Sequence, residues 1–201
     1  MTVPPPGGAV DFSSQKLCIA PSYPTTMYRL TKAIYPDPLG TGPGDSRFGD
    51  IRYHRGLPDP FQIMYLGPDY ETCFLETIVR DLGSAAGPGA LPIQETELEQ
   101  WNFSQISLPT NLKLLDLSGG NLVTMRIPTD VARASDHTLG MEWSRRFYEH
   151  PDEIDGLIFR SRLNEQFNIA IYDRAIVGLS VISTDPLMDD VFELGRVLDK
   201  Y

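Results

Sequence analysis

Residues 64–81, MYLGPDYETCFLETIVRD, contain a strand end, a turn and the start of a helix in one short stretch. The segment 62–66 is apolar enough for a strand, and Gly-Pro marks the turn that follows it. Asp69 is a residue type that caps helix N-termini, and Glu71 in the first turn suits the helix dipole. The helix is predicted by apolar residues at helical spacing, which are Phe74, Leu75, Ile78, Val79 and Leu82.

Outward from this stretch, short predicted strands alternate irregularly with helices. The strands are expected at 25–30, 47–53, 62–66, 104–108, 112–117, 156–160 and 167–172. Helices are expected at 138–149 and near Pro128, and at the C-terminus, where Asp185 is the predicted cap and Pro186 the first residue. Because the strands come in small groups without regular β–α–β alternation, the sequence predicts an α+β fold.

The length and the termini predict one compact domain. A chain of 201 residues corresponds to one domain at roughly 100–200 residues per domain. Residues 1–15 begin with the Pro- and Gly-rich MTVPPPGGAV and are expected to form a flexible tail, which leaves 16–201 as the folded domain. The N-terminus has no basic, apolar secretion signal, and no run of about 18 apolar residues predicts a membrane span.

The charge balance excludes some partners and leaves room for others. Lys and Arg number 17 against 27 Asp and Glu, a formal net charge of −10. This argues against direct nucleic-acid binding and against docking on an anionic membrane. Of the 17 basic residues, however, 13 are Arg, whose planar fork binds phosphates with paired hydrogen bonds. The acidic total can therefore conceal a local anion site.

The cysteines and histidines predict neither a disulfide framework nor a metal site. Cys18 and Cys73 lie 55 residues apart and match no metal or redox motif, which favours a reduced, cytoplasmic protein. The histidines His54, His137 and His150 lack ligand spacing, so no metal is predicted. The Gly-rich loops do not match the dinucleotide-binding fingerprint or the P-loop, and no GxSxG nucleophile motif is present.

Three segments carry the candidate chemistry. Tyr28 and Arg29 lie in TTMYRL, with Arg47 following in SRFG. In the stretch 64–81, Tyr65 ends a strand and Glu76 lies in the second turn of the helix. In DGLIFRSRL, residues 155–163, Ser161 follows an apolar strand and stands between two arginines.

This ordered set resembles the RES-domain family, the toxins of bacterial RES–Xre toxin–antitoxin pairs. The resemblance spans about residues 25–175, with Arg29, Arg47 in SRFG, Tyr65 and Glu76 in YLGPDYETCFLE, and Ser161 in DGLIFRSR at the positions of the family pattern. Cys73 and Phe74 stand where small residues are usual in the family. By this resemblance, 16–201 is a RES-like catalytic domain with a loop insertion at 83–102.

The resemblance implies a fold similar to that of the ADP-ribosyltransferase toxins, with mixed, mostly antiparallel sheets and flanking helices. It implies an enzyme that consumes NAD as a substrate, by phosphorolysis with inorganic phosphate or by hydrolysis. Two alternatives stay open, which are a mono-ADP-ribosyltransferase that modifies a host protein and a catalytically silent module that binds a nucleotide or a partner. A cognate Xre-type antitoxin is the implied protein partner, and a homodimer is left open.

Roles for the candidate residues follow from the same resemblance. Arg29 and Arg47 would neutralise the NAD pyrophosphate, and Tyr28 would contribute to the same binding site. Glu76 would stabilise the sugar cation that forms when nicotinamide leaves, or orient the nucleophile. Tyr65 would stack on a ring of the substrate, and Ser161 would bond the nicotinamide amide or a phosphate.

Each candidate also has a structural interpretation. Arg29 can pair with a carboxylate at a sheet edge, Tyr65 can be a core aromatic residue, and Ser161 can be a turn residue. On a helical wheel, Glu71 lies nearer the centre of the apolar stripe than Glu76, so the choice of Glu76 rests on the resemblance. Arg52, His54 and Arg55 either extend the anion site or form a solvated loop, and Asn168 is a further cleft candidate.

Overall fold

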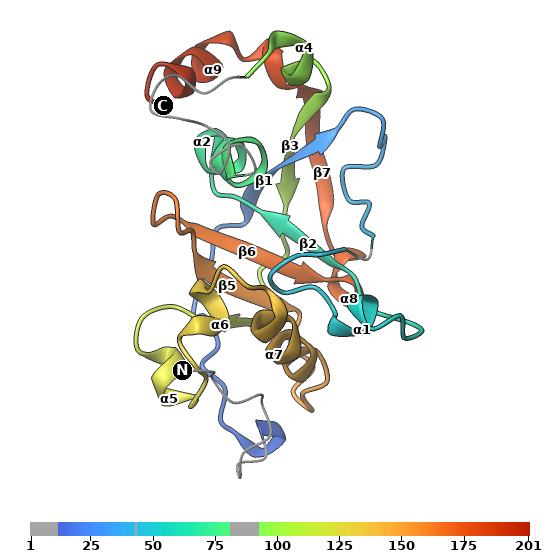
Figure 1. Ribbon diagram of the computed structural model, residues 1–201, viewed down its shortest axis with the longest axis vertical. Helices are drawn as coiled ribbons and strands as arrows, with labels where there is room; N and C mark the ends of the chain where they lie inside the picture. The colour runs from blue at the N-terminus through green and yellow to red at the C-terminus, as the bar shows by residue number, and fades with distance from the viewer. Residues whose placement is uncertain (1–11, 43, 81–92) are drawn as a thin grey trace.

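The computed structural model describes residues 12–42, 44–80 and 93–201, which form two β-sheets with helices on their outer sides (Figure 1). The three-stranded sheet has the order β1-β3-β7 and is antiparallel throughout. Its strands are β1 (Thr26–Lys32), β3 (Trp101–Ser107) and β7 (Ser180–Pro186). The four-stranded sheet has the order β2-β6-β5-β4, and only its β4–β5 pair is parallel. Its strands are β2 (Ile63–Leu66), β4 (Leu114–Asp116), β5 (Gly156–Arg160) and β6 (Phe167–Tyr172).

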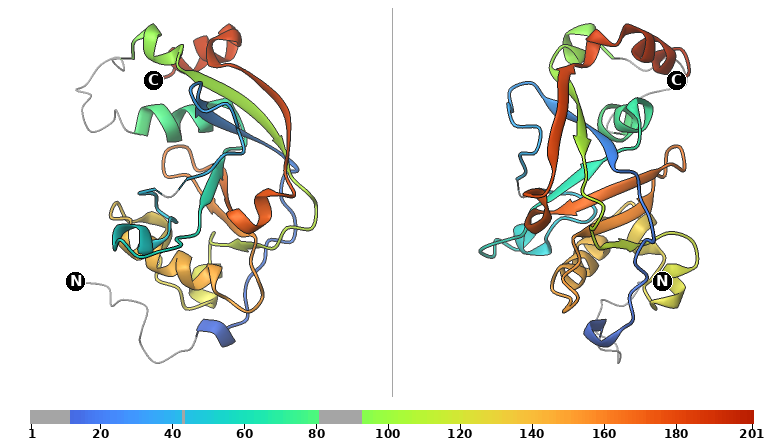
Figure 2. Two further views of the ribbon diagram at one scale, coloured as in Figure 1. Left: turned by 90° about the vertical axis from the view of Figure 1, so that its right-hand side faces the viewer. Right: turned by 180° about the vertical axis from the view of Figure 1, so that it is seen from behind.

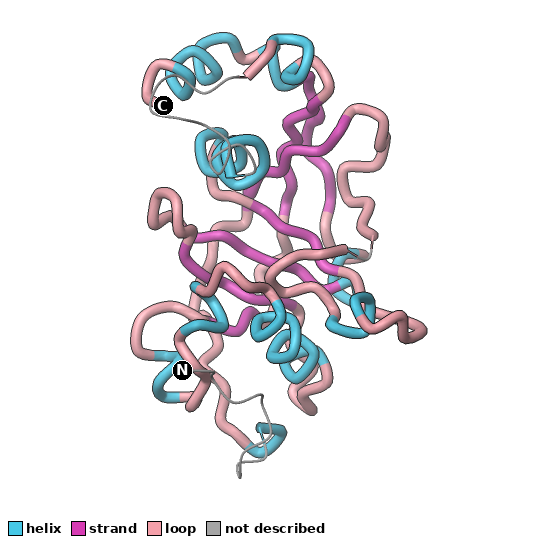
Figure 3. The backbone as a smooth tube through the Cα atoms, in the orientation of Figure 1, coloured by secondary structure: helices cyan, strands magenta, loops and turns pink. Residues whose placement is uncertain are grey.

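The helices are short, apart from α7 and α9, and Figure 3 shows that loops make up much of the remaining described chain. The α-helices are α1 (Ile51–His54), α2 (Tyr70–Phe74), α4 (Glu95–Leu98), α5 (Asn121–Thr124), α6 (Asp130–Arg133), α7 (Thr138–Tyr148), α8 (Asp173–Ile176) and α9 (Val191–Leu198). Two 3₁₀ turns are η1 (Phe12–Ser14) and η3 (Leu187–Asp189), and a π-helix, η2 (Leu75–Val79), directly continues α2. The predicted α+β fold is confirmed.

Three apolar clusters divide the molecule into layers. The first packs the outer face of the four-stranded sheet against α6 and α7, with Phe147 and Leu157 fully buried. The second lies between the sheets, where Met27 of β1 meets Met64 of β2. The third joins the three-stranded sheet to α2 and α9, which lie on the same side of that sheet (Figure 2). Along the strands of the four-stranded sheet, alternation sends successive side chains into the first and second clusters.

Among the described residues, one backbone pair connects the two sheets. Tyr28 of β1 and Gly67, the residue after β2, exchange two hydrogen bonds of 2.8 and 2.9 Å. A Cβ on Gly67 would lie 2.7 Å from the Sγ and 3.3 Å from the amide nitrogen of Cys73, so Cys73 of α2 packs tightly against this turn. The pair therefore places the start of β1 beside the start of the helix that carries Glu76.

Several predicted elements are confirmed. Asp69 caps α2, its carboxylate accepting a 2.7 Å bond from the Thr72 amide. The predicted strands 156–160 and 167–172 coincide with β5 and β6, and the helix predicted at 138–149 is α7. Periodicity and capping predicted these elements well because each is defined by contacts close in sequence or by a strongly apolar run.

Other predictions are wrong. The strand expected at 47–53 is a turn followed by α1, because the Asp50 side chain accepts from the Arg52 amide and caps a helix there. Asp185 and Pro186 end strand β7 instead of opening a helix, and α9 is capped by Asp190. The exposed strand β7 was not predicted, since its sequence SVISTDP lacks the alternation of polar and apolar residues that indicates a strand.

The described residues include only part of the predicted N-terminal tail and part of the predicted loop insertion. Residues 1–11 of the predicted tail lie outside the described residues, whereas Phe12 is buried edge-on against Trp143. Residues 83–92 of the predicted 83–102 loop insertion also lie outside them, while 93–102 contains α4 and the first residues of β3. None of the helices formed by residues 12–42, 44–80 and 93–201 has the length and apolar character needed to cross a bilayer.

Candidate active site

A cleft of about 620 Å³ is lined by β1, β2, the α2–η2 helix and the loops around Arg47 and Arg162. Of the predicted residues, Tyr28, Arg29, Arg47, Tyr65 and Glu76 all line it. The cleft therefore brings together residues that are up to 48 positions apart in the sequence. Its charged lining consists of Glu76 and five arginines, which are Arg29, Arg47, Arg80, Arg160 and Arg162.

Arg29 reaches the cleft from β1 and is also tied to the loop after it. Its Nη1 donates to the carbonyls of Pro38 at 2.6 Å and Gly40 at 2.9 Å. Burial lowers the pKa of Arg29, although the negative charge of Asp37 acts in the opposite direction. Both bonds use Nη1 of the guanidinium group. Tyr28 also lines the cleft, and its ring stacks on Phe103 at 5.2 Å.

Arg47 lies in the turn before α1, and helix α7 fixes its backbone. The Nη1 of Arg47 donates to the carbonyl of Ala134. Gly140 of α7 faces Arg47 so closely that an added Cβ would collide with the Arg47 carbonyl oxygen. Burial lowers the pKa of Arg47, and the nearby charge of Arg162 lowers it further.

Tyr65 holds both neighbours of Arg47. Its hydroxyl donates to the Ser46 Oγ at 3.1 Å and accepts from the Phe48 amide at 2.9 Å. Burial raises the pKa of the phenol, although these two hydrogen bonds act against the rise. The hydroxyl is thus a protonated anchor for the 46–48 segment, and the ring faces the cleft with Phe159 edge-on at 6.4 Å.

Glu76 is the acidic side chain of the cleft and lies in the π-helix η2. The Arg80 amide bonds to the Leu75 carbonyl five residues back, which is π-helical pairing. Such single-turn insertions occur frequently at functional sites. The Nδ2 of Asn168 on β6 donates to the Glu76 Oε1 at 3.1 Å. The Oδ1 of Asn168 is buried and has no partner among the described residues.

The helical-wheel comparison of Glu71 with Glu76 is settled by their partners. Glu71 is 9% exposed and accepts from Arg196, Lys200 and Tyr201 at the C-terminus, on the α9 side of the helix. Glu76 faces the cleft. The carboxylate nearer the centre of the apolar stripe is therefore the structural one.

Ser161 does not line the cleft. It is 2% exposed, its amide donates to the Gln166 carbonyl at 2.7 Å, and its Oγ accepts from the Leu163 amide at 3.0 Å. These bonds close the turn between β5 and β6, which is the structural interpretation of this residue. A contact of Ser161 with a substrate stays a prediction.

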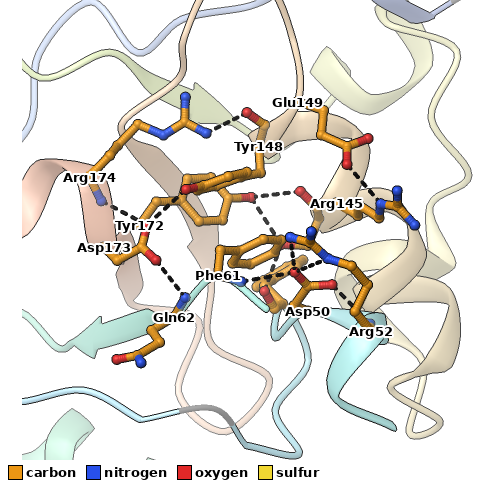
Figure 4. A network of polar contacts seen from close by, with 12 residues as sticks. Asp50, Arg52, Phe61, Gln62, Arg145, Tyr148, Glu149, Tyr172, Asp173 and Arg174 are labelled. Atoms are coloured by element: carbon orange, nitrogen blue, oxygen red, sulfur yellow. Dashed lines mark hydrogen bonds and ion pairs between the residues drawn. The ribbon is translucent and has the colours of Figure 1, made fainter. Parts of the chain in front are cut away.

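Arg52, His54 and Arg55 do not extend the cleft lining. Figure 4 shows Arg52 paired with Asp50, whose carboxylate also accepts from the Phe61 amide at 3.0 Å. Although burial alone would raise the pKa of Asp50, the bonds from Arg52 and Phe61 hold it below its usual value. Arg55 pairs with Glu142 at 2.9 Å, and His54 lies 3.3 Å from Asp45. These residues belong to the surface around α1.

Sequence reasoning gave Asn168 little weight and did not select Arg80 or Arg162. No local signal marks Asn168, which follows an ordinary strand start, whereas Arg162 lies in the DGLIFRSR segment itself. His137 is a further lining residue that was not predicted. Within the described part of the chain, no cluster of three or more His, Cys, Asp or Glu side chains is arranged to hold a metal ion.

The comparisons with known proteins identify the family of this chain. The family model described as RES domain matches residues 25–190. The chain belongs to the RES domain family. Probable toxin y4kH of Sinorhizobium fredii is 41% identical over 113 residues, which are 56% of this chain and 89% of that protein.

A solved structure has a similar fold. A chain of the M. tuberculosis MbcT–MbcA toxin–antitoxin complex matches with a TM-score of 0.61 and 18% identity, covering 87% of this chain and 90% of that chain. At that identity the match shows a common fold. All the residues that line the cleft lie within the RES domain, whereas α9 lies beyond its matched end.

Proposed function

We propose that this RES domain protein is a toxin that depletes cellular NAD by cleaving its nicotinamide–ribose bond. The observation that carries the proposal is the cleft itself, where the Glu76 carboxylate, held by Asn168, faces several arginines in a protein of net charge −10. A dianionic pyrophosphate needs cations, and a forming sugar cation needs a carboxylate. NAD contains both groups in one molecule.

The proposed reaction is a displacement at the ribose carbon C1′. The C1′–N1 bond breaks with both electrons going to nicotinamide, which leaves as a neutral molecule. An oxygen of phosphate or of water then forms the new bond to C1′, giving ADP-ribose 1″-phosphate or ADP-ribose. In hydrolysis the attacking water loses its proton to Glu76 or to solvent. Glu76 stabilises the positive charge on the sugar in either case.

The other residues position the substrate. Arg29 and Arg47 neutralise the pyrophosphate through the guanidinium donors that their backbone contacts leave available. Tyr65 keeps the Arg47 segment in place through Ser46 and Phe48, and its ring contacts a base of the substrate. Arg29 also donates hydrogen bonds to the carbonyls of Pro38 and Gly40, so substrate binding and the position of the loop that contains them are coupled.

The test is to incubate the purified protein with NAD, with and without inorganic phosphate, and to measure released nicotinamide by chromatography. Glu76→Gln should lower the rate by about 100-fold or more, as loss of one electrostatic stabiliser does. Glu99→Gln, an exposed carboxylate outside the cleft lining, should leave the rate unchanged. NAD that stays intact under both conditions, and with cell lysate added, would refute the proposal.

Two outcomes would redirect the assignment. If labelled NAD leaves label on a protein in lysate, the chain is an ADP-ribosyltransferase. If growth inhibition by the expressed protein survives Glu76→Gln in a folded variant, the chain acts as a binding module.

The proposed partner is a cognate Xre-type antitoxin, and the proposed place of action is the cytoplasm, where NAD is present. The supporting observation is that the structural relative comes from a toxin–antitoxin complex. Co-expression of the protein encoded by the adjacent reading frame should relieve growth inhibition, and that protein should co-purify with the toxin. Inhibition that persists beside a well-expressed neighbour would contradict this pairing.

A further inference from the structure

The turn between β5 and β6 places one apolar residue in the wall of the cleft. Residues 161–166 read SRLNEQ, so Leu163 is the apolar residue of an otherwise polar turn. It lines the cleft and is 44% exposed. A lone exposed leucine is common on protein surfaces and by itself indicates nothing. What distinguishes Leu163 is the way in which the turn is held.

Ser161 fixes the backbone of Leu163 from the β5 side. The Leu163 amide donates to the Oγ of Ser161 at 3.0 Å, and Ser161 is buried. The Ser161 amide in turn donates to the Gln166 carbonyl at 2.7 Å, which closes the turn around Leu163. The buried hydroxyl therefore fixes the backbone conformation in which Leu163 lines the cleft.

Asn164 ties the same turn to the helix that carries Glu76. Its Nδ2 donates to the Oγ1 of Thr72 at 2.8 Å, and its Oδ1 accepts from the Gln166 amide at 3.3 Å. Thr72 is fully buried on α2, four residues before Glu76, to which Asn168 donates. Two asparagines of one hairpin thus hold it against the α2–η2 helix, and the turn lies beside α2 in Figure 1.

A fixed apolar side chain in a cleft wall suits a flat ring. Because the Leu163 amide and the Asn164 side chain are both hydrogen-bonded, the turn has little freedom left to lose when a ligand packs on Leu163. Ligand sites combine such apolar walls with a few placed polar groups, which in this cleft are Glu76 and the arginines.

We propose that Leu163 is a specificity-determining residue that packs against an aromatic ring of the dinucleotide, and that Asn164 positions it through Thr72. The inference rests on the proposed function for the identity of the ligand. The ring has two sources in NAD, which are nicotinamide and adenine. ADP-ribose carries only the adenine and nicotinamide mononucleotide carries only the nicotinamide, so these two fragments distinguish the sources.

The first experiment measures binding of each fragment to the full-length protein by calorimetry. Leu163→Ala should raise the dissociation constant of one fragment about fivefold or more, because apolar contact area is lost, and should leave that of the other unchanged. Leu163→Met, which keeps the apolar volume, should bind like wild type. Leu57→Ala is the matched control, because Leu57 is 47% exposed and lies outside the cleft lining.

The second experiment tests the positioning role of Asn164. Asn164→Ala and Thr72→Val should each raise the same dissociation constant about threefold, since either substitution removes their hydrogen bond. The double variant should bind no more weakly than either single variant. Asn164→Ala should have no further effect in a Leu163→Ala background, which a general loss of stability would not produce. Thr72→Ser, which keeps the hydroxyl, should retain wild-type binding.

Three results would overturn the inference while the proposed function stands. Wild-type affinity for both fragments in a folded Leu163→Ala variant, as judged by circular dichroism, would exclude the contact. Equal weakening of both fragments would show a general effect on the cleft. An effect of Asn164→Ala that persists in the Leu163→Ala background would exclude its positioning of Leu163.

Failure of the proposed function gives different results. If the fragments bind as expected but NAD is never consumed, the contact with Leu163 stands and the proposed reaction fails. A wild-type protein that binds neither fragment would refute both.

Discussion

Asn168 controls how the cleft holds its carboxylate. Its Nδ2 donates to Glu76 at 3.1 Å, and its own Oδ1 is buried without a partner among the described residues. Leaving a buried amide oxygen unpaired costs about 1–3 kcal/mol. Such a cost fits the role we propose for Asn168, which is to orient Glu76 and to offer an acceptor to the amide of a bound substrate.

Asn168→Asp tests this positioning role. Two carboxylates about 3 Å apart share a proton, which raises the pKa of one of them. We expect the rate of NAD cleavage at pH 7 to fall about tenfold or more. The rate should recover in part as the pH rises, so the acid limb of the kcat/KM profile should move to higher pH. Asn168→Ala should lower kcat without moving that limb. An unshifted profile in Asn168→Asp would contradict the role.

At the scale of elements, α9 holds the helix that carries Glu76. Glu71 of α2 accepts from the Arg196 Nη1 at 2.9 Å, the Lys200 Nζ at 2.6 Å and the Tyr201 hydroxyl at 2.8 Å. Leu194 and Val197 pack into the cluster that contains Phe74. The segment after the RES domain match therefore fixes the near end of the α2–η2 helix.

The Glu71 contacts predict a pH dependence of stability. The Lys200 bond, and then those from Tyr201 and Arg196, outweigh burial and lower the pKa of Glu71 from 4.5 to about 2. Because the folded pKa is depressed, the stabilisation is complete above pH 4.5 and is lost as the pH falls towards 2. Glu71→Gln should unfold with about 2 kcal/mol less stability at pH 7.

Urea unfolding of wild type and Glu71→Gln between pH 7 and pH 2 measures this difference. The gap between the two midpoints should close across the window from 4.5 to 2. A gap that is constant with pH would show that the charge of Glu71 does not contribute.

The contact of α7 with the Arg47 turn gives another prediction at this scale. Gly140→Ala places a Cβ against the Arg47 carbonyl and 3.2 Å from the Val131 carbonyl. Overpacking of this kind costs about 1–3 kcal/mol, and we expect a raised KM for NAD as Arg47 moves. Gly195→Ala in α9, which meets nothing within 4 Å, is the control and should stabilise by about 0.5–1 kcal/mol. Equal effects of the two substitutions on thermal unfolding and KM would refute the contact.

At the scale of the whole molecule, the protein is acidic but its cleft is basic. The net charge is −10, whereas the cleft is lined by five arginines and Glu76. The expectation that Arg29 and Arg47 line one cleft is confirmed. An anionic substrate is thus attracted locally and repelled by much of the remaining surface.

This charge distribution predicts a salt dependence. The Debye length falls from about 30 Å at 0.01 M to about 8 Å at 0.15 M ionic strength, so screening weakens attraction to the arginines. We expect the KM for NAD to rise several-fold between 0.02 and 0.3 M NaCl while kcat changes little. A KM independent of salt would show that pyrophosphate recognition does not depend on these charges.

The accuracy of the sequence predictions follows the range of the interactions. Asp69 and the helix after it were predicted because capping and periodicity act over three to four residues. The strand predicted at 47–53 failed because Asp50 forms a cap there with further support from Phe61, eleven residues away. Asp185 and Pro186 have the composition of a helix start, yet pairing with β3 keeps them in β7.

In the candidate site, too, the sequence predicted the residues that lie in motifs and missed those that depend on distant contacts. The ordered motifs predicted five residues that line one cleft, which are Tyr28, Arg29, Arg47, Tyr65 and Glu76. Ser161 follows its strand as expected, but its Oγ is engaged in a turn. Asn168 has no sequence pattern that marks it, because its significance lies in a contact with Glu76, whereas Arg162 lies in the DGLIFRSR motif but was not selected.

The sequence by itself determined the fold class and the capped start of the helix that carries Glu76, because these depend on spacing and local capping. Only the tertiary structure decided which carboxylate faces the cleft, since Glu71 and Glu76 share one helix and differ in their distant partners, α9 and Asn168. It also decided that Arg47 and Arg162 converge, because one carbonyl at Ala134 holds both guanidinium groups.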